Sequence, residues 1–197
     1  MVNYDRSTAL VVVDVQNDFA DPKGSLYVGE GERIVPPLNR EIERALAVEA
    51  LVVYTQDWHP AQTPHFQSGG GVWPEHCVQY TWGAQLHPDL RVAGEVVRKG
   101  QGGEDGYSGF TVRDPVTGEA AATPLEELLR RRGVGRMVVV GLATDYCVKE
   151  TALDAVRLGF DTVVLGGLVR AVDLQPGDGQ RALAAMRAAG ARIEPPA

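Results

Sequence analysis

A cysteine near the start of a predicted helix is the first residue that could carry covalent chemistry. Residues 138–148 read VVVGLATDYCV, a short β-branched run typical of a buried strand, and Gly141 ends it. A helical pattern follows, with Thr144 or Asp145 as its cap, so Cys147 falls in the first turn. Free N–H groups and the helix dipole there favour a thiolate and can stabilise an oxyanion. The alternative for Cys147 is a small buried hydrophobic residue.

Three charged residues end other predicted strands: Asp14, Asp57 and Lys99. Ligands in open α/β sheets bind beyond the carboxyl ends of the strands, so we expect these residues to lie near Cys147. A thiol nucleophile needs a base that takes its proton and later returns it to the leaving amine. Asp14 can serve as this base and acid, with Lys99 holding its charge. Taken singly, Asp14 could cap a turn and Lys99 could be a solvated surface charge.

A second cluster has the composition of a metal site. Asp57 and His59 are two residues apart at a strand end, and His65 and His76 follow in the same long loop. One carboxylate and three imidazoles suit a divalent zinc, iron or manganese ion, so we predict one such metal per chain. The alternative is a set of surface or hydrogen-bonded histidines. His87 has no partner in the sequence and is predicted to be structural.

Aromatic residues accompany both clusters. Phe19 follows Asp14, Trp73 precedes His76, and Tyr107 follows a glycine-rich stretch. Each could simply pack in the core. If the two clusters meet, these rings could instead line a pocket for a flat substrate.

The elements that must position these side chains alternate between strand and helix. We predict the strands near residues 8–15, 50–55, 95–98, 138–141, 161–165 and 191–194, and the helices in 34–47, 123–132, 145–158 and 179–189. This alternation predicts a parallel sheet with helices on both faces and right-handed crossovers. Residues 1–197 are expected to form a single domain. The segment 58–88 has no clear period, and a loop of that length is often functional.

The overall composition narrows the partners. A net charge of −7 argues against a nucleic-acid or polyanionic partner. No apolar run approaches membrane-spanning length, and the first residues lack the pattern of a signal peptide. The two cysteines, Cys77 and Cys147, do not suggest a disulfide. A cytoplasmic protein is therefore expected.

At these residues the sequence resembles the nicotinamidase/pyrazinamidase branch of the isochorismatase-like cysteine hydrolases. The resemblance lies in VDVQNDF at 13–19, DWH at 57–59, WPEHCV at 73–78, KG at 99–100, YSGF at 107–110 and GLATDYCV at 141–148. It implies a Rossmann-like, three-layer α/β/α fold. It also implies an amidohydrolase that converts nicotinamide, and pyrazinamide, to nicotinate or the matching acid and ammonia. Members are often homo-oligomers.

The resemblance also implies roles for individual residues. Cys147 would form a thioester, Asp14 would move the protons, and Lys99 would support Asp14. The N–H groups of Ala143 and Cys147 would form the oxyanion hole, with a cis peptide at Leu142–Ala143. A metal on Asp57, His59, His65 and His76 would bind the ring nitrogen of the substrate, and Phe19, Trp73 and Tyr107 would line the ring pocket.

One stretch departs from the family pattern, and three rival functions remain. Residues 101–106 are unusually rich in glycine and acidic residues. The rivals are another amidohydrolase of the superfamily, such as an isochorismatase or N-carbamoyl amidase, a hydrolase that uses metal-bound water, and a non-catalytic binding module. The metal loop argues against the first rival. The combination of Asp14, Lys99 and Cys147 argues against the third.

Overall fold

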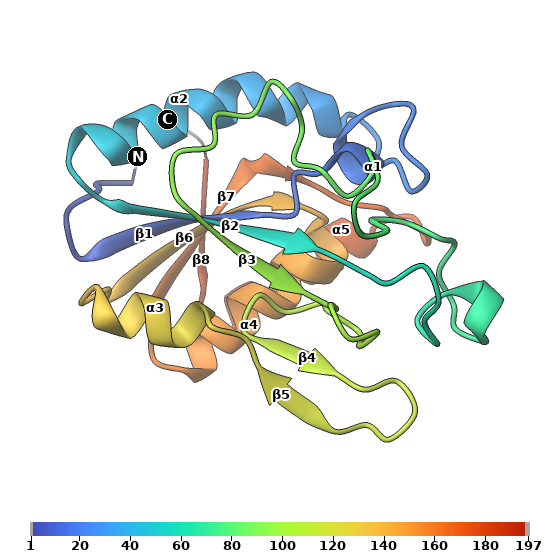
Figure 1. The fold of residues 1–197 in the computed structure, drawn as a ribbon. Coiled ribbons are helices and arrows are strands. Elements are labelled where there is room, and N and C mark those ends of the chain that lie inside the picture. The colour runs from blue at the N-terminus through green and yellow to red at the C-terminus, as the bar shows by residue number, and fades with distance from the viewer. Residues whose placement is uncertain (1, 196–197) are drawn as a thin grey trace.

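The computed structural model describes residues 2–195 as a six-stranded parallel sheet with helices on both faces (Figure 1). The strand order is β3-β2-β1-β6-β7-β8, and every neighbouring pair is parallel. The strands are β1 (Thr8–Val13), β2 (Leu51–Asp57), β3 (Glu95–Lys99), β6 (Arg136–Leu142), β7 (Asp161–Arg170) and β8 (Arg192–Glu194). The predicted parallel sheet is therefore confirmed.

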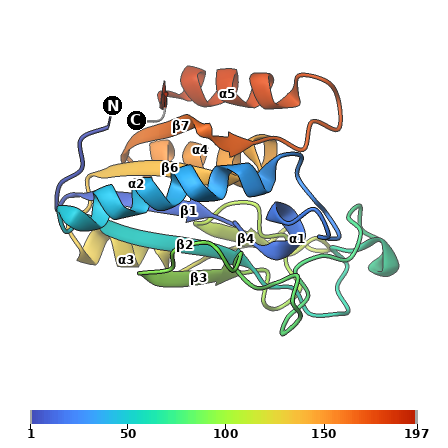
Figure 2. The same cartoon turned by 90° about the horizontal axis from the view of Figure 1, so that it is seen from above.

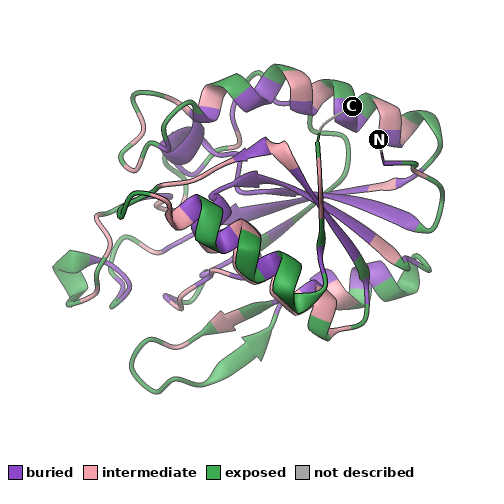
Figure 3. Cartoon of the chain, turned by 180° about the vertical axis from the view of Figure 1, so that it is seen from behind, coloured by how far each residue is buried: buried purple, intermediate pink, exposed green. Residues whose placement is uncertain are grey.

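Alternate residues of the central strands pack into two separate cores. In β1, Leu10 and Val12 pack with the buried face of α2 (Val35–Ala47). Ala9 and Val11 point the other way, toward α3 (Leu125–Arg131), α4 (Lys149–Arg157) and α5 (Asp178–Ala189). Figure 3 shows the central strands buried along most of their length and the long helices exposed on their outer side. The three-layer α/β/α fold is confirmed, because a strand buried on both faces needs a helical layer on each.

The sheet changes direction of winding between β1 and β6. The chain builds β2 and β3 on one side of β1, and β7 and β8 on the far side of β6. Figure 2 shows the order from β3 to β7 from above. The carboxyl ends of these two central strands form a topological switch point, where ligands bind in open α/β sheets. Asp14 and Cys147 both follow strands that end there.

Several short elements surround this edge and differ from the prediction. The segment after β1 contains α1 (Asn17–Ala20) and a 3₁₀ turn η1 (Gly31–Ile34) that leads into α2, and α1 is not among the predicted helices. A 3₁₀ turn η2 (Gln67–Gly69) interrupts the loop after β2. A small antiparallel hairpin, β4 (Thr111–Arg113) and β5 (Ala120–Ala122), was not predicted. Its strands are short and largely exposed, so they carry no apolar alternation to detect.

Helix boundaries agree with the prediction to within a few residues. Pro36 and Pro37 lie in the first turn of α2, where proline is tolerated. Pro124 occupies the cap position of α3, and the Thr123 hydroxyl before it accepts the Leu125 N–H at 3.2 Å. Within residues 2–195, no helix is long and apolar enough to cross a membrane.

Candidate active site

The carboxyl ends of four adjacent strands bring the predicted reactive residues together. Asp57 and Lys99 are direct neighbours in the register of β2 and β3. Asp14 follows β1 with a φ of 48°, a left-handed conformation that is uncommon outside glycine and is typical of functional turns. Acidic oxygens of Asp14 and Asp57 and the Cys147 sulfur all lie within 4.8 Å of one another.

Lys99 lies at the centre of this group and is completely buried. Its ammonium lies 2.8 Å from Asp14 Oδ2, 2.5 Å from Asp57 Oδ1 and 3.6 Å from Cys147 Sγ. It also donates to the Gly106 carbonyl. The sequence predicted that Lys99 supports Asp14. It did not predict that Lys99 also neutralises Asp57, which was assigned only to the metal.

The mutual arrangement sets the charge of each group. Burial raises the pKa of Asp14, and the Lys99 ammonium opposes this rise only in part. Burial alone would lower the pKa of Lys99, but Asp14 and Asp57 raise it well above its ordinary value. For Asp57, burial raises the pKa, but Lys99 and the neighbouring histidines outweigh it and the net pKa is lowered. Lys99 is therefore a permanent cation, and Asp14 is a carboxylate adapted to accept a proton.

The predicted lowering of the Cys147 pKa is wrong. Burial raises the thiol pKa well above its ordinary value, the Lys99 ammonium counteracts this incompletely, and the carboxylates of Asp14 and Asp57 raise it further. A thiolate would add a third buried negative charge beside those two. The resting sulfur is thus a thiol, and the group that removes its proton must be close by.

The backbone around Cys147 also differs from a regular helix start. The residue lies in a π-helical turn, η3 (Thr144–Val148), a feature often found at functional sites. The Ala143 carbonyl accepts hydrogen bonds from the N–H groups of Tyr146 and Val148, each at 3.1 Å, but not from the N–H of Cys147. The cis peptide expected at Leu142–Ala143 is present. Ala143 occupies the cap position, so the predicted capping by Thr144 or Asp145 is wrong.

Two features position the η3 turn next to the segments that follow β7 and β1. The Asp145 carboxylate accepts the N–H groups of Val172 at 3.0 Å and Asp173 at 2.9 Å, just beyond β7. Gly141 has a φ of 110°, and a Cβ atom there would lie 2.1 Å from the Val13 carbonyl oxygen. Only glycine permits this close approach of β6 to β1. The approach brings the Cys147 turn next to Asp14.

The four predicted metal ligands form a second buried cluster beside the first. Ring nitrogens of His59, His65 and His76 lie within 4.8 Å of one another. Asp57 Oδ2 lies 3.6 Å from His59 Nε2 and 3.9 Å from His76 Nε2. Among residues 2–195, neither ring nitrogen of buried His59 has a hydrogen-bond partner. An orphaned imidazole beside two others and a carboxylate fits a divalent transition metal.

The ionisation of these histidines also fits a metal. Burial lowers the pKa of His76 to about 4 and lowers that of His65, more than Asp57 and the other carboxylates raise them. Both rings are therefore neutral near pH 7, the form that ligates metals. His76 Nδ1 lies 2.7 Å from the Pro74 carbonyl oxygen, which leaves Nε2 for a ligand bond. His87 takes no part, and its Nδ1 accepts the Asp89 N–H at 3.2 Å.

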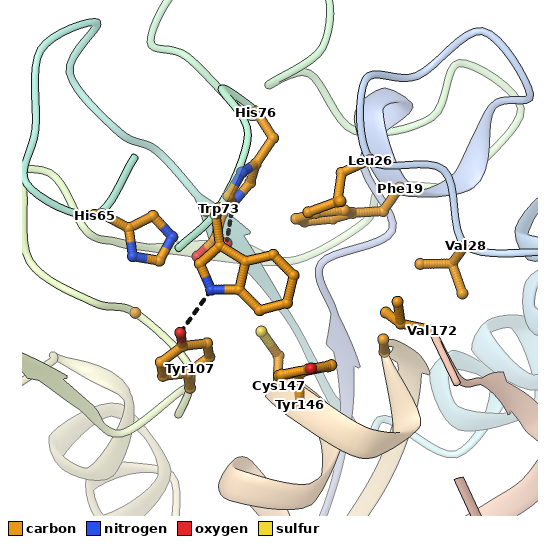
Figure 4. Close-up of a pocket in the computed structure, with 13 residues that line it drawn as sticks. Phe19, Leu26, Val28, His65, Trp73, His76, Tyr107, Tyr146, Cys147 and Val172 are labelled. Atoms are coloured by element: carbon orange, nitrogen blue, oxygen red, sulfur yellow. Dashed lines mark hydrogen bonds and ion pairs between the residues drawn. The ribbon is translucent and has the colours of Figure 1, made fainter. Parts of the chain in front are cut away.

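A pocket joins the two clusters. Asp57, His65, His76 and Cys147 line it together with the three aromatic residues predicted from the sequence, Phe19, Trp73 and Tyr107. Figure 4 shows the Cys147 sulfur pointing into the pocket, with the rings of His65 and His76 on another side. Trp73 Nε1 donates to the Tyr107 hydroxyl at 2.7 Å, and burial raises the pKa of Tyr107 to about 12.

Five further lining residues were missed: Leu26, Val28, Gly106, Tyr146 and Val172. Leu26, Val28 and Val172 come from irregular segments that carry no periodic signal. Tyr146 adjoins Cys147 in the sequence and could have been found from that position. Its ring packs edge-on to Trp73 with centroids 4.9 Å apart. Both Cys77 and Cys147 are free and buried.

Comparison with known proteins places the chain in a family. The Isochorismatase domain family matches residues 8–194, and the chain belongs to this family. The nicotinamidase of Escherichia coli (strain K12) is 40% identical over 203 residues, which cover 94% of this chain and 93% of that protein.

The chain is also similar to solved structures of related proteins. The pyrazinamidase of Pyrococcus horikoshii in complex with zinc has a TM-score of 0.86 at 39% identity, covering 96% of this chain and 99% of that one. A protein from L. infantum in complex with nicotinate has a TM-score of 0.88 at 36% identity, covering 98% and 96%. The family resemblance inferred from the sequence is confirmed.

Proposed function

We propose that this protein is a nicotinamidase, which hydrolyses nicotinamide, and also pyrazinamide, to the carboxylic acid and ammonia. The observation that carries the proposal is one pocket lined by a thiol beside a carboxylate and by a cluster of metal-binding side chains. Its aromatic walls suit a flat ring. The similarity to the E. coli nicotinamidase and to the zinc-bound pyrazinamidase supports the same substrate class.

Cys147 is the proposed nucleophile. Its sulfur attacks the amide carbon while its proton passes to Asp14, whose carboxylate oxygen lies within 4.8 Å. The oxyanion that forms accepts hydrogen bonds from the N–H groups of Ala143 and Cys147. Asp14 then gives the proton to the nitrogen, the C–N bond breaks, and ammonia leaves a thioester on Cys147.

The second half of the reaction uses the same groups. Asp14 takes a proton from a water molecule that attacks the thioester carbonyl, and the C–S bond breaks. The sulfur regains its proton from Asp14, and the acid is released. Lys99 remains charged throughout, so it stabilises the Asp14 carboxylate whenever the proton is elsewhere.

Asp57, His59, His65 and His76 are the proposed ligands of one zinc, iron or manganese ion. When bound, this ion supplies a Lewis-acid anchor for the ring nitrogen of the substrate. The side chains of Phe19, Trp73 and Tyr107 exclude water from the ring and orient its carboxamide toward Cys147. We further propose that the chain forms a single domain, is located in the cytoplasm, acts in NAD salvage and forms a homo-oligomer. These proposals follow from the family resemblance and the composition.

The test compares nicotinamide with benzamide, which has the same shape and carboxamide but no ring nitrogen. We expect ammonia and nicotinate from nicotinamide, and a kcat/KM for benzamide lower by up to about 10⁴, because a site that binds a polar group rejects the analogue that lacks it. Chelation should impair nicotinamide turnover much more than benzamide turnover. Equal hydrolysis of both amides, lost together on chelation, would instead indicate a metal-water hydrolase in which Cys147 is structural.

A further inference from the structure

The segment 100–106 connects Lys99, beside the thiol, to Tyr107, in the wall of the pocket. It leaves β3 directly after Lys99 and returns to the pocket at Tyr107. The Gly103 carbonyl accepts the Thr63 hydroxyl at 2.6 Å. Two backbone hydrogen bonds join Asp105 to Arg113 in β4, at 2.7 and 2.9 Å. The main chain of this segment is therefore fixed without help from the Asp105 side chain.

The Asp105 side chain is free to make a different contact. Its Oδ1 lies 2.5 Å from His65 Nδ1. The His65 side chain is only 3% exposed and that of Asp105 is 24% exposed, so the bond is shielded mainly on the histidine side. Because Nδ1 is occupied, Nε2 is the His65 nitrogen left for a ligand bond. His76 is held in the same way by a backbone carbonyl.

We propose that Asp105 is a positioning residue for the metal site and acts through His65. Metal-ligating histidines usually donate their other N–H to a carboxylate or carbonyl, which fixes the tautomer and the ring orientation and makes the ligating nitrogen more basic. Asp105 provides that acceptor for His65. The inference rests on the metal site of the proposed function. It assigns a role to the acidic, glycine-rich stretch, which the sequence left unexplained.

The same segment also serves the catalytic group. The next residue, Gly106, accepts a hydrogen bond from the Lys99 ammonium. Two consecutive residues thus hold a metal ligand and the lysine that neutralises Asp14 and Asp57. The contact with His65 uses the Asp105 side chain, whereas the hydrogen bond from Lys99 uses the Gly106 backbone carbonyl. Substitution of Asp105 therefore removes only the contact with His65.

The experiment measures zinc affinity of the metal-free protein against a chromophoric chelator, with no substrate present. We expect Asp105→Ala to bind zinc about 10–100-fold more weakly than the wild type. Glu104→Ala is the matched control, because it removes the same charge from the same loop. The Glu104 carboxylate accepts the Gly102 N–H at 2.8 Å. This control should bind zinc within about twofold of the wild type.

A double-mutant cycle with His65→Ala gives the decisive result. If Asp105 acts through His65, adding Asp105→Ala to His65→Ala should change zinc affinity by less than about twofold. The inference is overturned if Asp105→Ala binds zinc like the wild type, if Glu104→Ala loses as much affinity, or if the loss persists without His65. Failure of the wild type to bind zinc would instead overturn the metal site itself.

Discussion

Replacing Lys99 with methionine removes the buried ammonium that compensates the carboxylates of Asp14 and Asp57. Lys99 has no exposed side-chain surface, and its ion pairs with Asp14 and Asp57 are 2.8 and 2.5 Å long. Breaking a buried pair by removing one partner costs about 3–5 kcal/mol, because the other charge stays buried and unpaired. A whole domain is stable by only about 5–15 kcal/mol. We therefore expect Lys99→Met to lose about 3–5 kcal/mol of unfolding free energy.

Urea unfolding followed by circular dichroism measures this loss. Both proteins should be free of metal, because a bound ion adds its own stabilisation to the folded state. Lys149→Met is the matched control. Lys149 is partly exposed and lies 3.2 Å from Glu150, and such a surface pair contributes no more than about 1 kcal/mol. A loss below about 1 kcal/mol for Lys99→Met would refute the reasoning about the buried charges.

The same variant has a defined pH dependence. Burial already raises the pKa of Asp14, and loss of Lys99 removes the largest effect that opposes that rise. A carboxyl group whose pKa is higher in the folded than in the unfolded state favours folding when protonated, and this stability is lost as the pH rises through the folded pKa. The deficit of Lys99→Met relative to the wild type should therefore be smaller near about pH 5 than near about pH 8.

Two further variants and one control variant address the chemistry. Cys147→Ala should abolish turnover of nicotinamide while binding of nicotinamide, measured by calorimetry, persists, whereas Cys77→Ala should keep most of the activity. Turnover of nicotinamide at the wild-type rate by Cys147→Ala would exclude a thioester intermediate on Cys147. Asp14→Asn should lower kcat by about 10²–10⁴ with little loss of fold, because the general base and acid is gone. Retention of more than about a tenth of kcat would exclude a role of that size.

The fold was predictable because its signals are local. The β-branched runs in β1 and β6 are long enough to identify buried strands, and their alternation with helices implies a parallel sheet. A parallel sheet places every carboxyl end at one edge, so Asp14, Asp57, Lys99 and Cys147 could be expected to meet. The exposed hairpin β4–β5 and the short turns carry no such signal. They are held mainly by backbone hydrogen bonds and contacts distant in sequence.

The ionisation of the site was less predictable than its composition. The position of Cys147 at a helix start correctly suggested free N–H groups, but it gave the wrong direction for the thiol pKa. That direction depends on burial and on two carboxylates from β1 and β2, which only the folded chain brings near the sulfur. The link between Asp105 and His65 spans 40 residues, and neither residue has a periodic pattern. Such contacts depend on how irregular loops pack.

Asp57 contacts both the histidine cluster and the Lys99 ammonium beside Cys147, so the two parts of the site are not independent. Its Oδ1 lies against Lys99, and its Oδ2 faces His59 and His76. Substitution of Asp57 would remove a proposed metal ligand and would also remove one of the two carboxylates that pair with Lys99, so lost turnover could not be assigned to either cause. The His65 side chain instead contacts Asp105 through Nδ1. Changes at His65 or Asp105 should therefore perturb the proposed metal site while the ion pairs of Lys99 with Asp14 and Asp57 stay in place. Such variants would separate the proposed anchoring of the substrate from the chemistry of the thiol.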